Sequence, residues 1–95
     1  MITENEWPTI DSAFNENFTD ELSTALRDLF ALGCYLHAKG QLKAGKKAIR
    51  TALLPTNIYN RTDNLFDRIF SNLPGNEKTF LQKINPHSEI LGLLE

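Results

Sequence analysis

The feature that most constrains the fold is an eight-residue apolar run, Leu29 to Leu36, inside a stretch with helical periodicity. Apolar residues recur three and four positions apart between about residues 20 and 39, which predicts one long helix. They form an inner face, made of Leu22, Ala25, Leu26, Leu29, Gly33 and Leu36, and a second row, made of Phe30, Cys34 and His37. Because the run is apolar nearly all round, we expect the helix to be covered on several sides within one domain.

Local signals mark both ends of this helix. Thr19 is a good N-cap, because its hydroxyl can accept a hydrogen bond from an unpaired backbone N–H, and two acids follow it at the positive end of the helix dipole. Gly40 ends the helix. A second helix follows over about residues 41–54 and stops at Pro55, so the two form an antiparallel hairpin.

Shorter helices are predicted on either side of the hairpin. Pro8 opens a short one near the N-terminus, and Trp7 before it either docks on the core or is free for a partner. Thr62 and Asn76 cap two more helices, and Pro86 opens a short last one. No stretch shows convincing strand alternation.

The predicted fold is therefore all-α, a small bundle of five or six helices around the hairpin. The parts of this single domain, residues 1–95, are the N-terminal segment 1–18, the helical hairpin 19–54 and the C-terminal helices 62–95.

Several classes of protein are disfavoured by the composition. A single cysteine, Cys34, allows no intramolecular disulfide, which argues against a secreted disulfide scaffold. Residues 1–6 lack the basic start and apolar run of a signal peptide, and no stretch approaches the roughly 18 apolar residues that a membrane span needs. We expect a cytoplasmic protein with no membrane segment.

Catalytic and metal-binding patterns are also missing from the sequence. No nucleophile is bracketed by a base and an orienting acid, and no Gly-rich phosphate loop occurs. Cys34 and His37 share a helical face, but structural zinc normally needs four ligands and the only other histidine is His87. We expect no enzyme, no cofactor and no metal, and interpret the pair as a core cysteine beside a partly buried histidine.

Charge is segregated along the chain. Residues 1–28 hold seven acids and one base, whereas residues 29–62 hold six bases and no acid. Four of these bases follow one face of the second helix and form what we call the basic stripe: Lys43, Lys46, Lys47 and Arg50. The stripe could contact phosphate, or it could be a solvated face that the acidic N-terminal segment neutralises. We expect the solvated face, because no aromatic residue is interleaved for base stacking.

Residues 32–55, LGCYLHAKGQLKAGKKAIRTALLP, resemble one tetratricopeptide-type helical hairpin. In that repeat an apolar residue and a glycine sit midway along the first helix, as Leu32 and Gly33 do here, and another glycine ends the helix, as Gly40 does. A small residue then lets the helices touch, as Gly45 could. The chain departs from the pattern at Ile49, where an aromatic is usual, and it shows only one repeat.

The segment YLHAKG, residues 35–40, is also similar to the first hairpin of small tetratricopeptide-like chaperones for type III secretion needle subunits. Members of that group hold the amphipathic C-terminal helix of the needle subunit in a concave groove, often with a second small helical chaperone. The resemblance implies a groove lined by Arg27, Phe30, Cys34, His37 and Ala38. The alternative is that Phe30 and Cys34 pack against the C-terminal helices of the same chain.

The sequence thus favours a non-enzymatic helical protein-binding module. It would act as a small cytoplasmic chaperone or adaptor that shields an amphipathic helix of a partner, with a needle chaperone as the specific case. The alternative is a small nucleic-acid-binding or regulatory protein that uses residues 43–50.

Overall fold

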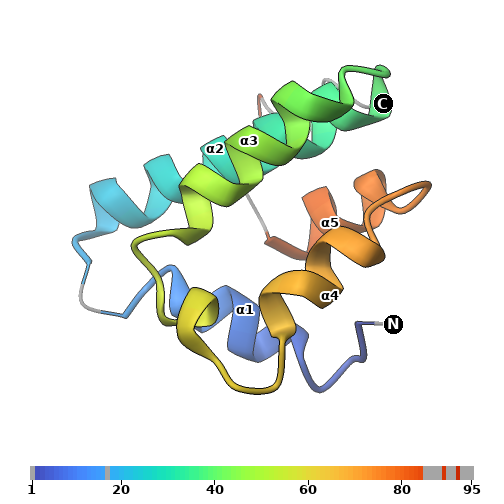
Figure 1. Cartoon of the computed structure of the whole chain (residues 1–95). Coiled ribbons are helices and arrows are strands. Elements are labelled where there is room, and N and C mark those ends of the chain that lie inside the picture. Colours follow the sequence, from blue (N-terminus) through green and yellow to red (C-terminus); the bar gives the residue numbers. More distant parts are fainter. Residues whose placement is uncertain (1, 17, 85–88, 90–91, 93–95) are drawn as a thin grey trace.

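The computed structural model describes residues 2–16, 18–84, 89 and 92, and this part of the chain folds into helices without any strand (Figure 1). The helices in chain order are α1 (Trp7–Ala13), α2 (Asp20–Ala38), α3 (Leu42–Leu53), the 3-10 helix η1 (Asn57–Asn60), α4 (Leu65–Ser71) and α5 (Glu77–Ile84). The prediction of an all-α bundle is confirmed. The last helix predicted after Pro86 lies outside the described residues.

The helices form two layers. The antiparallel hairpin of α2 and α3 is the upper layer in Figure 1, and α1, α4 and α5 lie below it. α5 packs along α2, and α1 packs against α5. No described helix lies on the far side of the hairpin, which is its upper side in Figure 1.

The long helix begins and ends where the sequence predicts. The hydroxyl of Thr19 accepts a hydrogen bond from the backbone N–H of Leu22 at 3.2 Å. At the other end Gly40 has a φ of +89°, and the N–H groups of Gly40 and Gln41 bond to carbonyls of the last turn of α2. Glycine adopts this left-handed backbone conformation at little cost in free energy because it has no Cβ, so Gly40 fixes the turn into α3.

Two glycines let α2 and α3 approach closely. A Cβ added to Gly33 would lie 2.5 Å from Cγ1 of Ile49 and 2.7 Å from the carbonyl oxygen of Gly45. A Cβ added to Gly45 would lie 2.7 Å from the carbonyl oxygen of Gly33. These distances are far below the roughly 3.5–4.0 Å of an ordinary carbon contact. The predicted role of Gly45 as the small residue at the helix crossing is confirmed.

Aromatic side chains fill the space between the layers. The ring of Phe30 lies 5.9 Å from that of Phe14 in an edge-on arrangement and stacks on that of Phe80 at 6.4 Å. Trp7 meets Phe80 edge-on at 4.9 Å and is only 8% exposed. Trp7 therefore docks α1 on the core of its own chain.

Two features between α3 and α5 differ from the prediction. α4 begins at Leu65, and Thr62 is not its cap; instead the carboxylate of Asp63 accepts the N–H of Leu65 at 3.3 Å. The predicted loop after α3 contains η1, which starts where the hydroxyl of Thr56 accepts the N–H of Ile58 at 3.3 Å.

Candidate functional site

The structure brings together four of the five residues predicted to line a groove and covers them with the chain's own helices. Phe30, Cys34 and His37 are buried, and the side chain of Arg27 is nearly so. Only Ala38, at the end of α2, is exposed. α5 occupies the place expected for a partner helix, so these positions pack within the chain, as the alternative interpretation predicted.

Polar contacts hold α5 at both of its ends. In its first turn the carboxylate of Glu77 accepts a hydrogen bond from Nδ1 of His37 at 2.6 Å. At its last residue the carbonyl of Ile84 accepts a hydrogen bond from Nη1 of Arg27, also at 2.6 Å. Arg27 pairs in addition with the carboxylate of Asp11 in α1. Arg27 and His37 therefore fasten the lower layer to α2.

Burial and the hydrogen bond between Glu77 and His37 affect the ionisation of two groups on the inner side of α2. Burial raises the pKa of the Cys34 thiol to about 12, and the charge of Glu77 adds to the effect. Burial also raises the pKa of Glu77, but hydrogen bonds from backbone N–H groups and from His37 outweigh it, so this pKa lies below its usual value of 4.5. Cys34 is consequently a thiol at neutral pH, whereas a thiolate is the nucleophile and metal ligand.

No metal site emerges from the part of the chain that the structure describes. Its His, Cys, Asp and Glu side chains form no group of three or more that could hold an ion.

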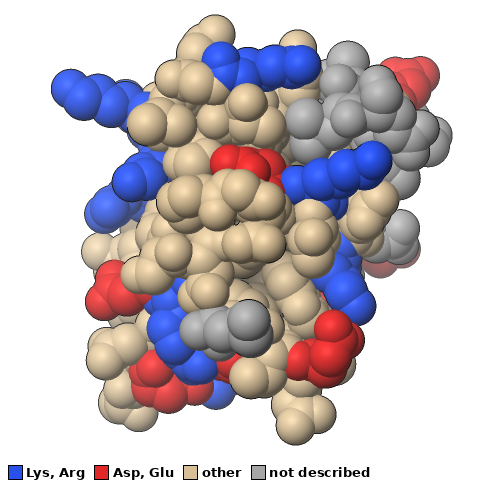
Figure 2. Space-filling view, turned by 90° about the vertical axis from the view of Figure 1, so that its right-hand side faces the viewer, with Lys and Arg blue, Asp and Glu red and all other residues tan. Residues whose placement is uncertain are grey.

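The basic stripe is exposed along α3, and the N-terminal acids do not neutralise it. These acids bond cations of other helices: Glu4 with Lys83, Glu6 with Arg68, and Asp11 with Arg27. Figure 2 shows lysine and arginine side chains projecting in the upper part of the molecule, at the height of the hairpin, with most of the acids of that view lower down. The stripe is a solvated face, but the N-terminal acids that form ion pairs do not neutralise it, because they pair with Arg27 of α2 and with cations of the lower layer.

Within the stripe, Arg50 differs from the three lysines. Its guanidinium carbon lies 5.5 Å from the ring centre of Phe66 and 5.8 Å from that of Phe70, so Arg50 leans towards the lower layer. The three lysines form no ion pair with any acid of the described ranges. They leave three positive charges available on the surface of α3.

A second apolar surface lies on the far side of the hairpin. On α2 an apolar residue recurs there alternately every three and four positions, and we call this row the α2 stripe: Leu22, Ala25, Leu29, Leu32 and Leu36. Leu22 is 45% exposed and Leu32 37% exposed, Ala25 is exposed, and Leu29 and Leu36 are half-buried. Alternating three- and four-residue spacing is the pattern with which one helix of a coiled coil meets another.

Helix geometry places the α2 stripe beside the small residues of α3. Each helical residue advances by about 100°. Around the axis of α2, Gly33 points to α3. Phe30 lies on one side of Gly33 and faces the lower layer, and the α2 stripe lies on the other side. On α3 Ile49 likewise separates Ala48 from Arg50. The resulting surface, which we call the hairpin face, consists of the α2 stripe with Ala44, Ala48 and Thr51.

The sequence does not predict this surface, because periodicity alone places every apolar row of the long helix on its covered side. Leu22 and Ala25, expected on the inner face, are exposed. The pattern that indicates the surface is the alternating three- and four-residue spacing that runs through Leu32. This row is separate from the row of Phe30 and Cys34, which one covering helix is enough to bury.

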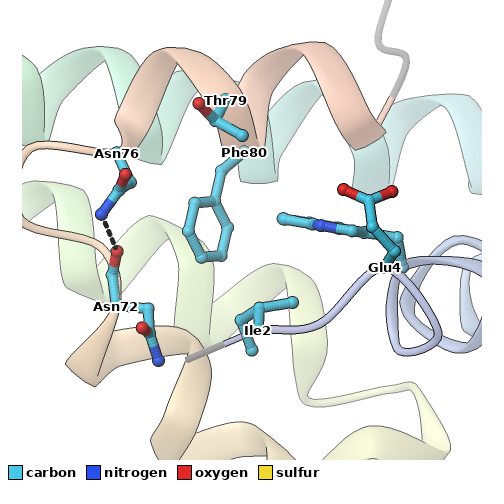
Figure 3. Close-up of a pocket in the computed structure, with 7 residues that line it drawn as sticks. Ile2, Glu4, Asn72, Asn76, Thr79 and Phe80 are labelled. Carbon is cyan, nitrogen blue, oxygen red and sulfur yellow. Dashed lines mark hydrogen bonds between the residues drawn. The ribbon is translucent and has the colours of Figure 1, made fainter.

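A small pocket opens between the N-terminal segment and α5 (Figure 3). Its volume is about 170 Å³, and its lining residues are Ile2, Glu4, Trp7, Asn72, Asn76, Thr79 and Phe80. The amide of Asn76 is already engaged, because it donates to the carbonyl oxygen of Asn72 at 3.0 Å. Ligand pockets usually span about 300–1,000 Å³, so this pocket suits a group no larger than a side chain.

Comparison with models of protein families, with curated proteins and with solved structures finds no match. None of the described helices combines the length and the apolar character required to cross a membrane. The surface chemistry of the hairpin is therefore the feature that bears on function.

Proposed function

We propose that the chain is a non-enzymatic helical protein-binding module, a small chaperone or adaptor that shields the apolar side of a partner's amphipathic helix. The observation that carries the proposal is the α2 stripe, with Leu22 and Leu32 exposed on a side of the hairpin that no described helix covers. A contiguous exposed apolar surface of this kind typically marks a protein interaction site. The partner helix would lie on the opposite side of α2 from α5.

The dimensions of the hairpin face suit one helix. From Leu22 to Leu36 the α2 stripe runs for about 21 Å at 1.5 Å per residue, so a partner helix of about 15 residues would cover it. The small side chains of Ala44 and Ala48 would let that helix sit between α2 and α3. Recognition would follow the helix-in-groove mode, with apolar anchors three and four residues apart.

The similarity of residues 35–40 to small tetratricopeptide-like chaperones for needle subunits supports the same function and names a first client. That client is a needle-type subunit with an amphipathic C-terminal helix, bound in the cytoplasm with or without a second small helical chaperone. The hairpin face is the surface on which we would place the client helix, because α5 fills the groove that the resemblance implied.

A second candidate function is nucleic-acid binding by the basic stripe. It is favoured by the three lysines that pair with no acid in the described ranges. Such binding would weaken steeply with salt, since each phosphate contact releases a counterion. Absence of a gel shift with single- and double-stranded oligonucleotides at low salt would remove this candidate.

A labelled peptide of about three heptads tests the main proposal, with leucine at the apolar heptad positions and neutral polar residues elsewhere. We expect saturable binding by fluorescence anisotropy. Leu32→Asp should weaken it by about tenfold or more, because burying one leucine side chain is worth about 1.5–3 kcal/mol. Thr24→Asp, exposed on another side of α2, is the matched control and should leave the affinity unchanged.

Two results would contradict the proposal. One is the absence of saturable binding by the unmodified chain. The other is an equal effect of Leu32→Asp and Thr24→Asp, with circular dichroism showing that both variants are folded.

A further inference from the structure

We infer that the partner helix carries a row of acidic side chains along one edge, and that this edge lies over α3. The inference rests on the proposed function, because it takes the hairpin face as the docking surface and adds the chemistry of its occupant. It is carried by the positions of two lysines of the basic stripe relative to the hairpin face, and by the charges of the α2 edge, where two acids outnumber one lysine.

Lys43 and Lys47 border the hairpin face on α3. Lys47 follows Ala44 by three residues and precedes Thr51 by four, so it lies directly beside both on the helix surface. Lys43 lies one turn before Lys47 on the same row. A helix seated over Ala44 and Ala48 would therefore pass within reach of both ammonium groups.

The other half of the basic stripe points elsewhere. Lys46 lies two residues after Ala44 and two before Ala48. At about 100° per residue, two residues turn a side chain to nearly the opposite side of the helix, so Lys46 lies on the other flank of α3. It shares that flank with Arg50, whose guanidinium lies over Phe66 and Phe70 of α4. Lys47 therefore lies nearest to the hairpin face, and Lys43 lies next to it on the helix surface; Arg50 shares the row of Lys43 but is drawn to the rings of α4. This division separates the inference from binding of phosphate by the whole stripe.

The two edges of the hairpin face differ in charge. Lys43 and Lys47 are exposed and pair with no acid in the described part of the chain. The α2 edge carries two acids, the exposed Glu21 and the half-buried Asp28, and one base, the exposed Lys39, so its net charge is negative. A partner acid is attracted over α3 and repelled over α2, so the charges set both the choice of partner and its side-to-side orientation.

A second copy of this chain is a poorer occupant than an acidic helix. Its own α2 edge has two acids, Glu21 and the half-buried Asp28, which are seven residues and so two helical turns apart. A partner helix with acids one turn apart would match the one-turn spacing of Lys43 and Lys47, which Glu21 and Asp28 do not.

The experiment compares two labelled peptides with the same leucine stripe, one with glutamate along one edge and one with lysine at those positions. We expect the acidic peptide to bind about tenfold tighter at low salt, and the difference to shrink as salt rises, because the lysines are solvent-exposed. Lys43→Glu with Lys47→Glu should reverse the preference. Lys46→Glu with Lys78→Glu makes the same change in net charge away from the hairpin face and should preserve it.

The outcomes separate this inference from the proposed function. Binding of neither peptide would overturn both. Equal binding of the two peptides, or equal effects of the two double variants, would overturn the acidic edge alone. A dimer in light scattering that Leu32→Asp dissociates would assign the hairpin face to a second copy and overturn the inference. An oligonucleotide that displaces the acidic peptide, and that needs Lys46 as much as Lys47, would do the same.

Discussion

Gly33→Ala will destabilise the protein even though alanine is the better helix former. Gly33 lies in the middle of α2, where α3 passes closest. A methyl group there would lie 2.5 Å from Cγ1 of Ile49 and 2.7 Å from the carbonyl oxygen of Gly45. The side chain of Ile49 can rotate, but the carbonyl of Gly45 is backbone and moves only if α3 moves.

The expected loss follows from two opposing effects. Alanine in place of glycine stabilises a helix interior by about 1 kcal/mol. Overpacking costs about 1–3 kcal/mol, and the upper end applies here because the obstacle includes the backbone of α3. The net loss in free energy of unfolding should be about 2 kcal/mol, which lowers Tm by about 8–16 °C in a domain of this size.

Urea unfolding followed by far-UV circular dichroism measures this loss. Gly45→Ala should act similarly, because its added Cβ would meet the carbonyl oxygen of Gly33 at 2.7 Å. The double variant should lose less than the two single losses together, since one separation of the helices relieves both overlaps.

Thr24→Ala is the matched control, because Thr24 is exposed on the same helix. It should leave stability unchanged or slightly raised. A Gly33→Ala variant as stable as the unmodified chain, or more stable, would refute the close approach of α2 and α3, because that result is what helix propensity alone predicts.

Three further predictions concern the inner side of α2. The free energy of unfolding should fall as the pH drops below about 4.5. The pKa of Glu77 is lower in the folded chain than its usual value, so ionised Glu77 stabilises the fold above pH 4.5, and this stabilisation is lost as the pH falls through the lowered pKa. Glu77→Gln should flatten this dependence in urea titrations, and an unchanged dependence would contradict the pairing with His37. Arg27→Met should cost about 2–3 kcal/mol by the same assay, since it removes charged contacts with both α1 and α5. A cost within error of zero would mean that these contacts do not hold the layers together. Cys34 should react with a thiol reagent only after unfolding, because it is buried with a pKa of about 12; reaction of the native protein at the rate of a free thiol would contradict that burial.

Elements whose ends depend on local chemistry could be predicted from the sequence. The hydroxyl of Thr19 and the left-handed turn at Gly40 act within a few residues, so the bounds of α2 follow from them. The start of α4 could not be predicted in this way, because Thr62 and Asp63 are adjacent and both suit a cap. In the structure Asn64 takes the N-cap position in a left-handed conformation, and the carboxylate of Asp63 is held by Arg61 and by Arg68 of α4.

The candidate site could be predicted only in part, because periodicity gives the faces of a helix but not what covers each face. Phe30 and Cys34 do share a buried face, and the chain fills it with α5 rather than leaving it to a partner. The exposure of Leu22 and Leu32 depends on the lengths of the helices that cover α2. α1 has seven residues and α5 has eight, so they cover the lower side of the 19-residue α2 and cannot also reach its far side.

An amide proton–nitrogen correlation spectrum of the isotope-labelled chain, titrated with the acidic peptide, locates the docking surface residue by residue. We expect the largest shifts on the hairpin face, at Ala25, Leu29, Leu32, Ala44 and Ala48, while the amide signals of α5 stay in place. Shifts centred on Phe80 and Leu81 would mean that the partner displaces α5 from the inner side of α2. Either that result or an unchanged spectrum would contradict the hairpin face as the docking surface.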